Sequence, residues 1–67
     1  MKQVDLWLPE DVTIQASDGT IYSGINHIES GPNGYAETYD GEVILFDDMD
    51  ADMLQQVEQI IEDYGDV

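Results

Sequence analysis

Apolar and polar residues alternate with a period of two along the first two thirds of the chain, a pattern typical of β-strands. Residues 4–8 and residues 12–16 each place three apolar side chains on one face. Asp18-Gly19 then predicts a two-residue hairpin turn before a third strand over residues 21–28. The chain is therefore expected to open with short antiparallel strands.

The third predicted strand is irregular, and two more strands follow it. Its apolar phase slips after Ile25, which indicates a bulge near Gly24 or Asn26. Residues 35–39 alternate again, and a second Asp-Gly pair predicts another hairpin turn. Residues 42–46 are the most apolar strand, so we expect that strand to be central in the sheet.

The last third of the chain has the periodicity of an amphipathic helix. Asp48 or Asp50 can cap its N-terminus, and Gly65 suits the left-handed position that follows a last helical turn. The predicted apolar stripe repeats at three- and four-residue spacing and comprises Met53, Leu54, Val57, Ile60, Ile61 and Tyr64.

These elements predict an α+β fold in a single domain over residues 1–67. We expect a small antiparallel meander of four to five strands with one C-terminal helix packed on one face. The pattern leaves the strand order open. The chain has no cysteine, which excludes a disulfide framework and suits a reducing cytoplasm. It begins with Met1 and has acids where a signal peptide needs an apolar stretch, so we expect a complete, cytoplasmic gene product.

The net charge of the chain is the property that says most about its function. The formal net charge is -15 on 67 residues, and Lys2 is the only fixed cation. Such an excess destabilises the compact state through self-repulsion, so a chain that carries it is expected to use the field. Anionic membranes and nucleic acid itself would repel the protein. The expected partner is a basic, nucleic-acid-binding protein, with the chain itself a monomer or weak dimer.

The predicted helix carries the sharpest charge pattern. Asp52, Glu58, Glu62 and Asp63 lie opposite the apolar stripe, with no lysine or arginine four residues away. Seven carboxylates between Asp47 and Asp63 would span about 25 Å of helix, roughly one per 3.6 Å against about 3.4 Å for phosphates along a DNA strand. This surface mimics a nucleic-acid backbone, is a solvated face, or serves another binding role.

We therefore expect the partner-binding surface to include the acids around the helix, with the hairpin acids as the next candidates. Trp7 is the preferred aromatic anchor, because its strand points three aliphatic side chains the other way. Whether Trp7 and the tyrosines belong to the core or to an interface stays open at this point. The predicted partner-binding residues are Asp47, Asp48, Asp50, Asp52, Glu58, Glu62, Asp63, Glu37, Asp40, Glu42 and Trp7.

Catalytic and metal motifs are weak. His27 is the only histidine, and residues around Ser23 and Ser30 give no nucleophile elbow. Asp48-x-Asp50-x-Asp52 has the spacing that opens an EF-hand loop, but glycine at position six and glutamate at position twelve are missing. We therefore expect no enzyme, no cofactor and no specific metal site.

In size, charge and lack of cysteine the whole chain resembles the small acidic DNA-mimic inhibitors encoded by phages and mobile elements. These include anti-CRISPR proteins, anti-restriction proteins and uracil-DNA glycosylase inhibitors. The resemblance implies an inhibitor that occupies a nucleic-acid-binding groove, most specifically an anti-CRISPR protein acting on a CRISPR-Cas complex in the host cytoplasm. The alternatives are an acidic binding module for another basic partner, such as a toxin, a repair enzyme or a transcription factor, or a structural or assembly protein.

Overall fold

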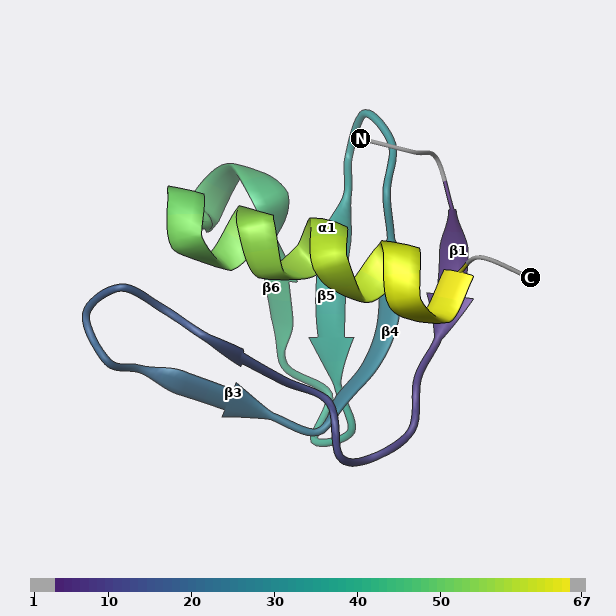
Figure 1. Ribbon diagram of the computed structural model, residues 1–67, viewed down its shortest axis with the longest axis horizontal. Coiled ribbons are helices and arrows are strands. Elements are labelled where there is room, and N and C mark those ends of the chain that lie inside the picture. Colours follow the sequence, from purple (N-terminus) through teal and green to yellow (C-terminus); the bar gives the residue numbers. More distant parts are fainter. Residues whose placement is uncertain (1–3, 66–67) are drawn as a thin grey trace.

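The computed structural model describes residues 4–65 and places four strands in one antiparallel sheet. The sheet comprises β1 (Asp5–Trp7), β4 (Ile25–Glu29), β5 (Tyr35–Thr38) and β6 (Val43–Leu45), in the spatial order β1-β4-β5-β6. Figure 1 shows these strands side by side, with the helix lying across one face of them. Strands β4 to β6 follow one another as a meander, whereas β1 pairs with β4 and so joins the far edge.

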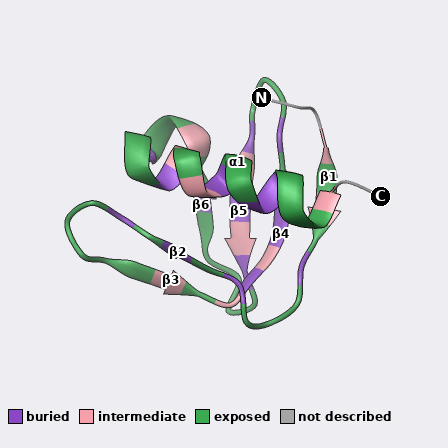
Figure 2. Ribbon diagram, viewed as in Figure 1, coloured by how far each residue is buried: buried purple, intermediate pink, exposed green. Residues whose placement is uncertain are grey.

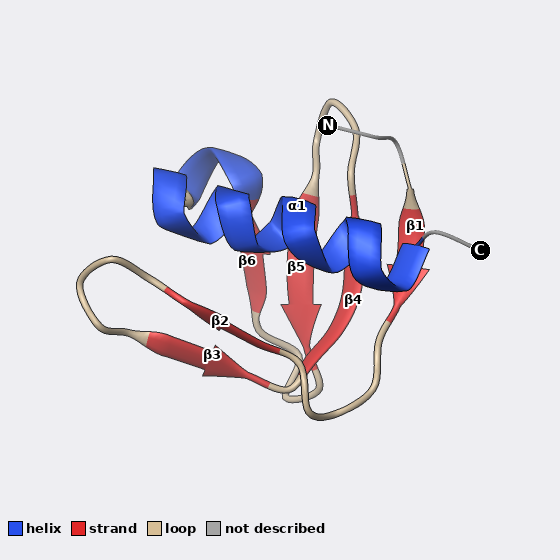
Figure 3. Cartoon of the chain, viewed as in Figure 1, coloured by secondary structure: helices blue, strands red, loops and turns tan. Residues whose placement is uncertain are grey.

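The two remaining strands form a separate hairpin of β2 (Thr13–Gln15) and β3 (Ile21–Ser23), which extends beside the sheet (Figure 3). The chain passes from β3 to β4 through Gly24, whose φ of +70° favours glycine. A register shift between Ile25 and His27 follows at once. The bulge predicted near Gly24 or Asn26 is therefore present, and the predicted third strand is divided at Gly24 between two sheets.

A 3-10 helix, η1 (Phe46–Asp48), leads into the α-helix α1 (Ala51–Gly65). Asp50 caps α1, since its Oδ1 accepts a hydrogen bond of 2.8 Å from the Met53 backbone amide. The helix buries Met53, Val57, Ile60 and Ile61, and Figure 2 shows buried stretches alternating with exposed ones along its ribbon. The most deeply buried large side chains are Ile14, Ile25, Ile28 and Val57.

Polar bonds attach the hairpin to the helix. The Gln15 backbone amide donates to Gln56 Oε1 at 2.9 Å, and Gln56 Nε2 donates to the Gln15 carbonyl at 2.7 Å. Asp50 Oδ2 accepts from both the backbone amide and the hydroxyl of Ser17, at 3.0 and 2.9 Å. The side chain of Gln56 thus makes the two hydrogen bonds that a neighbouring strand would make to the Gln15 backbone. Asp50 links the start of the helix to the turn of the hairpin.

The predicted α+β class is confirmed, but some details of the prediction are wrong. Strand β6, predicted to be central, is an edge strand, with Ile44 in the core and Val43 and Leu45 about half exposed. The prediction is wrong because an uninterrupted apolar run does not show which of its residues face the core. Both Asp-Gly turns are three-residue loops whose last residue, Gly19 or Gly41, has a positive φ.

The predicted end of the helix is also wrong in part. Gly65 does not have a left-handed φ, because it is still part of the helix as its last residue. In the predicted apolar stripe, Leu54 is half-buried and Tyr64 is exposed, while the other four residues are buried.

Candidate functional site

The face of the four-stranded sheet that α1 does not cover is lined by two cross-strand rows of side chains. Strand alternation and register place these rows on one side, opposite the buried row of Leu6, Ile28, Ala36 and Ile44. We call this surface the outer sheet face. It comprises Asp5, Glu29, Tyr35 and Leu45 in one row, and Trp7, His27, Glu37 and Val43 in the other.

Aromatic rings organise one half of the outer sheet face. Trp7 is 67% exposed, and its ring stacks on the His27 imidazole with centroids 4.2 Å apart. Tyr35 meets the same imidazole edge-on, at a centroid distance of 5.7 Å. Burial and the charges of Glu29, Glu37 and Asp5 raise the pKa of the Tyr35 hydroxyl. Trp7 is thus a surface residue rather than a core residue, and it covers a histidine that is 5% exposed.

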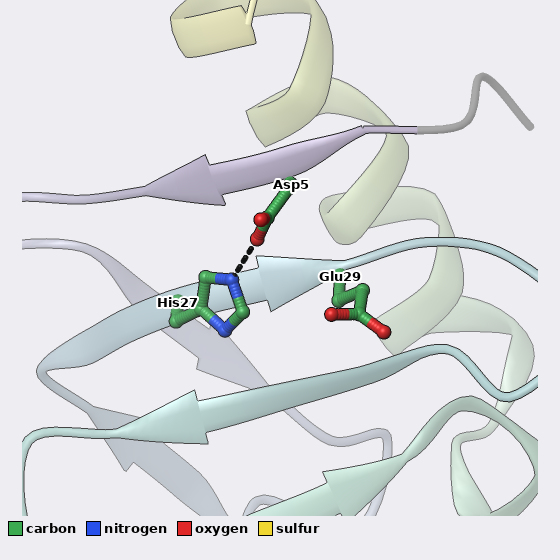
Figure 4. Close-up of side chains that lie close together, drawn as sticks. All are labelled: Asp5, His27 and Glu29. Atoms are coloured by element: carbon green, nitrogen blue, oxygen red, sulfur yellow. Dashed lines mark hydrogen bonds and ion pairs between the residues drawn. The ribbon is translucent and has the colours of Figure 1, made fainter.

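His27 is held by one carboxylate as well as by two aromatic rings. Its Nε2 pairs with Oδ1 of Asp5, and Figure 4 shows the two side chains pointing toward one another from β4 and β1, with Glu29 farther along β4. Ligand atoms of Asp5, His27 and Glu29 all lie within 4.8 Å of one another. Asp5 and Glu29 are exposed while the histidine is buried, so the cluster opens toward solvent.

The outward face of α1 is acidic without apolar residues at its centre. Asp52, Glu58, Glu62 and Asp63 are all exposed, as their position opposite the apolar stripe predicts. Gln59 Nε2 donates to Asp63 Oδ1 at 3.0 Å. A hollow of ≈ 540 Å³ lies where this face meets the hairpin, and amide side chains including Gln55 and Gln56 line it together with Asp52.

The acids before the helix do not continue its acidic face. Asp47 and Asp48 are exposed in η1, and α1 begins only at Ala51, so the seven carboxylates do not lie along one helix. Asp50 is committed to its bonds with Ser17 and Met53, which lower the pKa of its carboxyl. The Thr20 backbone amide likewise lowers the pKa of Asp18 in the hairpin turn. At Asp18 these hydrogen bonds outweigh burial and repulsion from Asp50, and at Asp50 they outweigh the effect of burial.

The structure distributes the predicted site residues over two opposite sides of the molecule. Trp7 and Glu37 lie on the outer sheet face, whereas the four helix acids point away from the sheet on the other side. Asp40 and Glu42 are exposed at the turn between β5 and β6. No one surface contains the whole predicted set.

Sequence reasoning missed several members of the outer sheet face, namely Asp5, His27, Glu29, Val43 and Leu45. The signal for His27 and Glu29 was their spacing of two, which places both on one side of a strand. Asp5 joins them through the pairing of β1 with β4, a long-range contact that alternation alone does not specify.

Comparison with protein-family models, with curated proteins and with solved structures found no match to this chain. Within residues 4–65, no helix has the length and apolar character needed to cross a membrane.

Proposed function

We propose that this chain is an inhibitor that binds a basic, nucleic-acid-binding protein in place of nucleic acid. The observation that carries the proposal is the distribution of its charge. Among residues 4–65 no aspartate or glutamate is buried, and that part of the chain contains no lysine or arginine. A surface with this distribution attracts cationic grooves from every approach and speeds their association with the protein.

The outer sheet face supplies what charge alone lacks, which is a place for short-range contact. Trp7, Val43 and Leu45 are 67%, 50% and 47% exposed, and Asp5, Glu29 and Glu37 lie among them. Protein interfaces combine aromatic anchors with a polar surround, and tryptophan is enriched among the residues that contribute most binding energy. We therefore place the contact on this face, with the helix acids acting at longer range.

Within this function, an anti-CRISPR role against a CRISPR-Cas complex is the most specific form of the proposal, and it places the protein in the host cytoplasm. It is supported by the resemblance in size and charge. Such a role is one of binding, and it requires neither catalysis nor a bound cofactor.

The proposal is tested by binding and competition. The chain is immobilised and exposed to a bacterial lysate at low and high salt, and each retained protein is purified and titrated in the presence and absence of duplex DNA and RNA. We expect a retained nucleic-acid-binding protein whose affinity falls steeply as salt rises, and from which nucleic acid displaces the chain. Simultaneous binding of nucleic acid and this chain, with no mutual loss of affinity, would rule out mimicry.

The second candidate is an acidic binding module for a basic partner that is not a nucleic-acid enzyme. The exposed apolar side chains of the outer sheet face favour it, because a charge mimic does not require them. In the same experiment, this function predicts capture that mutation of Trp7 weakens and that nucleic acid leaves unchanged.

A further inference from the structure

The pairing of β1 with β4 brings three potential metal ligands to one point of the outer sheet face. Asp5 lies directly opposite Glu29 in the register, and His27 precedes Glu29 by two residues and so shares its side of the strand. Their ligand atoms lie within 4.8 Å of one another. The donors of a tetrahedral zinc ion are about 3.3 Å apart, given metal–ligand distances of about 2.0–2.2 Å. Asp5, whose Oδ1 pairs with His27 Nε2, and Glu29 would have to rotate their carboxylates to reach that arrangement.

The electrostatics of this point favour a cation. Like charges directly opposite one another on neighbouring strands are destabilising. Here Asp5 faces Glu29, and Glu37 faces His27 from the next strand. Residues 4–65 contain no lysine or arginine that could offset these carboxylates. A divalent ion bound between Asp5 and Glu29 would replace their repulsion with two attractive contacts.

The histidine is already held in place, and the carboxylates are accessible. Trp7 stacks on the imidazole and Tyr35 meets its edge, so the ring is fixed before any ligand arrives. Asp5 and Glu29 line an open hollow of ≈ 470 Å³, which gives an ion a path of entry and leaves room for water ligands. A fixed nitrogen donor beside two exposed oxygen donors is a suitable basis for a metal site.

We infer that Asp5, His27 and Glu29 bind one divalent transition-metal ion, with Zn²⁺ as the test ion. The imidazole donor favours zinc and its first-row neighbours, whereas Mg²⁺ and Ca²⁺ favour sites built from oxygen alone. Three protein ligands leave at least one coordination position for water or for a group from another molecule. The inference does not depend on the proposed inhibitory function and concerns the isolated protein.

The experiment is a titration of the full chain with Zn²⁺, followed by calorimetry and by NMR of the imidazole of His27. Since His27 is the only histidine, its ring signals are unambiguous. We expect one saturable equivalent of Zn²⁺, with a shift of the His27 ring signals that is complete at that equivalent. Mg²⁺ at the same concentration should leave the ring signals unchanged.

Matched variants separate a specific site from diffuse binding to a very acidic protein. Asp5→Asn and Glu29→Gln change exposed residues and preserve shape, and Glu10→Gln makes the same change in charge at an exposed residue outside the cluster. Loss of an indirect partner of a metal site costs about 10–100-fold in affinity, so we expect each direct-ligand variant to lose at least about tenfold and Glu10→Gln to bind as the original chain does.

Two outcomes would overturn the inference. The first is equal loss of Zn²⁺ affinity in Glu10→Gln and in the cluster variants, which would mean that general charge holds the ion. The second is an unshifted His27 ring at saturating Zn²⁺. Because that readout uses the unaltered chain, it remains decisive if a variant fails to fold.

Discussion

The outer sheet face and the outward face of α1 are both acidic, yet they are built differently. The helix face presents Asp52, Glu58, Glu62 and Asp63 among glutamines, with each acid exposed to water. The sheet face places its acids beside Trp7, Val43 and Leu45 and around a buried histidine. The helix face therefore offers charge alone, while the sheet face offers charge together with apolar area and a fixed imidazole.

This difference indicates which surface can discriminate between partners. Exposed carboxylates act mainly through the long-range field, which salt screens over about 8 Å at physiological ionic strength. Apolar contacts and fixed donors act only in direct contact, and they determine how long a complex lasts. In a protein with this much negative charge, electrostatic attraction alone does not distinguish one basic partner from another.

The largest expected effect tests whether the outer sheet face exists as described. Ile44 is buried and its neighbours Val43 and Leu45 are half exposed, so the two sides of β6 should respond oppositely to truncation. Ile44→Ala should lower the free energy of unfolding by about 2–5 kcal/mol. Leu45→Ala and Val43→Ala should each change it by less than about 1 kcal/mol. Chemical denaturation measures all three, and equal losses would mean that β6 is buried on both sides.

The next largest effect concerns partner binding. Trp7→Ala should weaken binding to the captured target by about 2 kcal/mol or more, roughly 30-fold, because a large apolar contact is lost. Tyr64→Ala is the matched control, since Tyr64 is an exposed aromatic residue on the helix, which lies on the other side of the sheet. Surface plasmon resonance would show the loss as faster dissociation. A larger effect at Tyr64 would move the contact to the helix.

A smaller effect should follow from neutralising the helix face. The combined variant Asp52→Asn, Glu58→Gln, Glu62→Gln and Asp63→Asn should slow association by about tenfold at low salt while leaving dissociation nearly unchanged. Its circular dichroism should match that of the original chain, because all four residues are exposed. If dissociation changed instead, these acids would be in direct contact with the partner.

The smallest effect separates acids that shape the fold from acids that only carry charge. Asp50→Ala should lower thermal stability at neutral pH, whereas Asp52→Ala should leave it nearly unchanged, because Asp52 is exposed and does not cap the helix.

This difference should also depend on pH. Hydrogen bonds from Ser17 and Met53 lower the pKa of the Asp50 carboxyl in the folded state. Its stabilising contribution is therefore present above the ordinary carboxyl pKa of about 3.9 and is lost as pH falls through the lowered folded value. Melting curves at pH 7 and pH 3 should show the gap between the two variants closing at the lower pH. If the difference in melting temperature between the two variants were as large at pH 3 as at pH 7, the effect of Asp50→Ala would come from the backbone and not from the charge of the carboxylate.

Local pattern was sufficient to predict the α+β class, the bulged third strand and the capped helix. Alternation, Asp-Gly pairs and helical spacing act over a few residues, so the sequence shows them directly. The pattern could not assign β6 to an edge, because an uninterrupted apolar run has no visible polar side. The local pattern also could not predict that Asp5 lies beside His27 and Glu29, since that contact depends on which strand lies next to β1.

The pairing of β1 with β4 also determines when the outer sheet face is assembled during folding. Strands β4, β5 and β6 contact their immediate neighbours in sequence, so they can form early, whereas β1 must wait for a partner beyond the intervening hairpin. Trp7 is the only tryptophan and reaches His27 only when β1 docks. We therefore expect its fluorescence to report a late kinetic event, the closing of the sheet at its N-terminal edge, and circular dichroism at helical wavelengths to report the formation of α1.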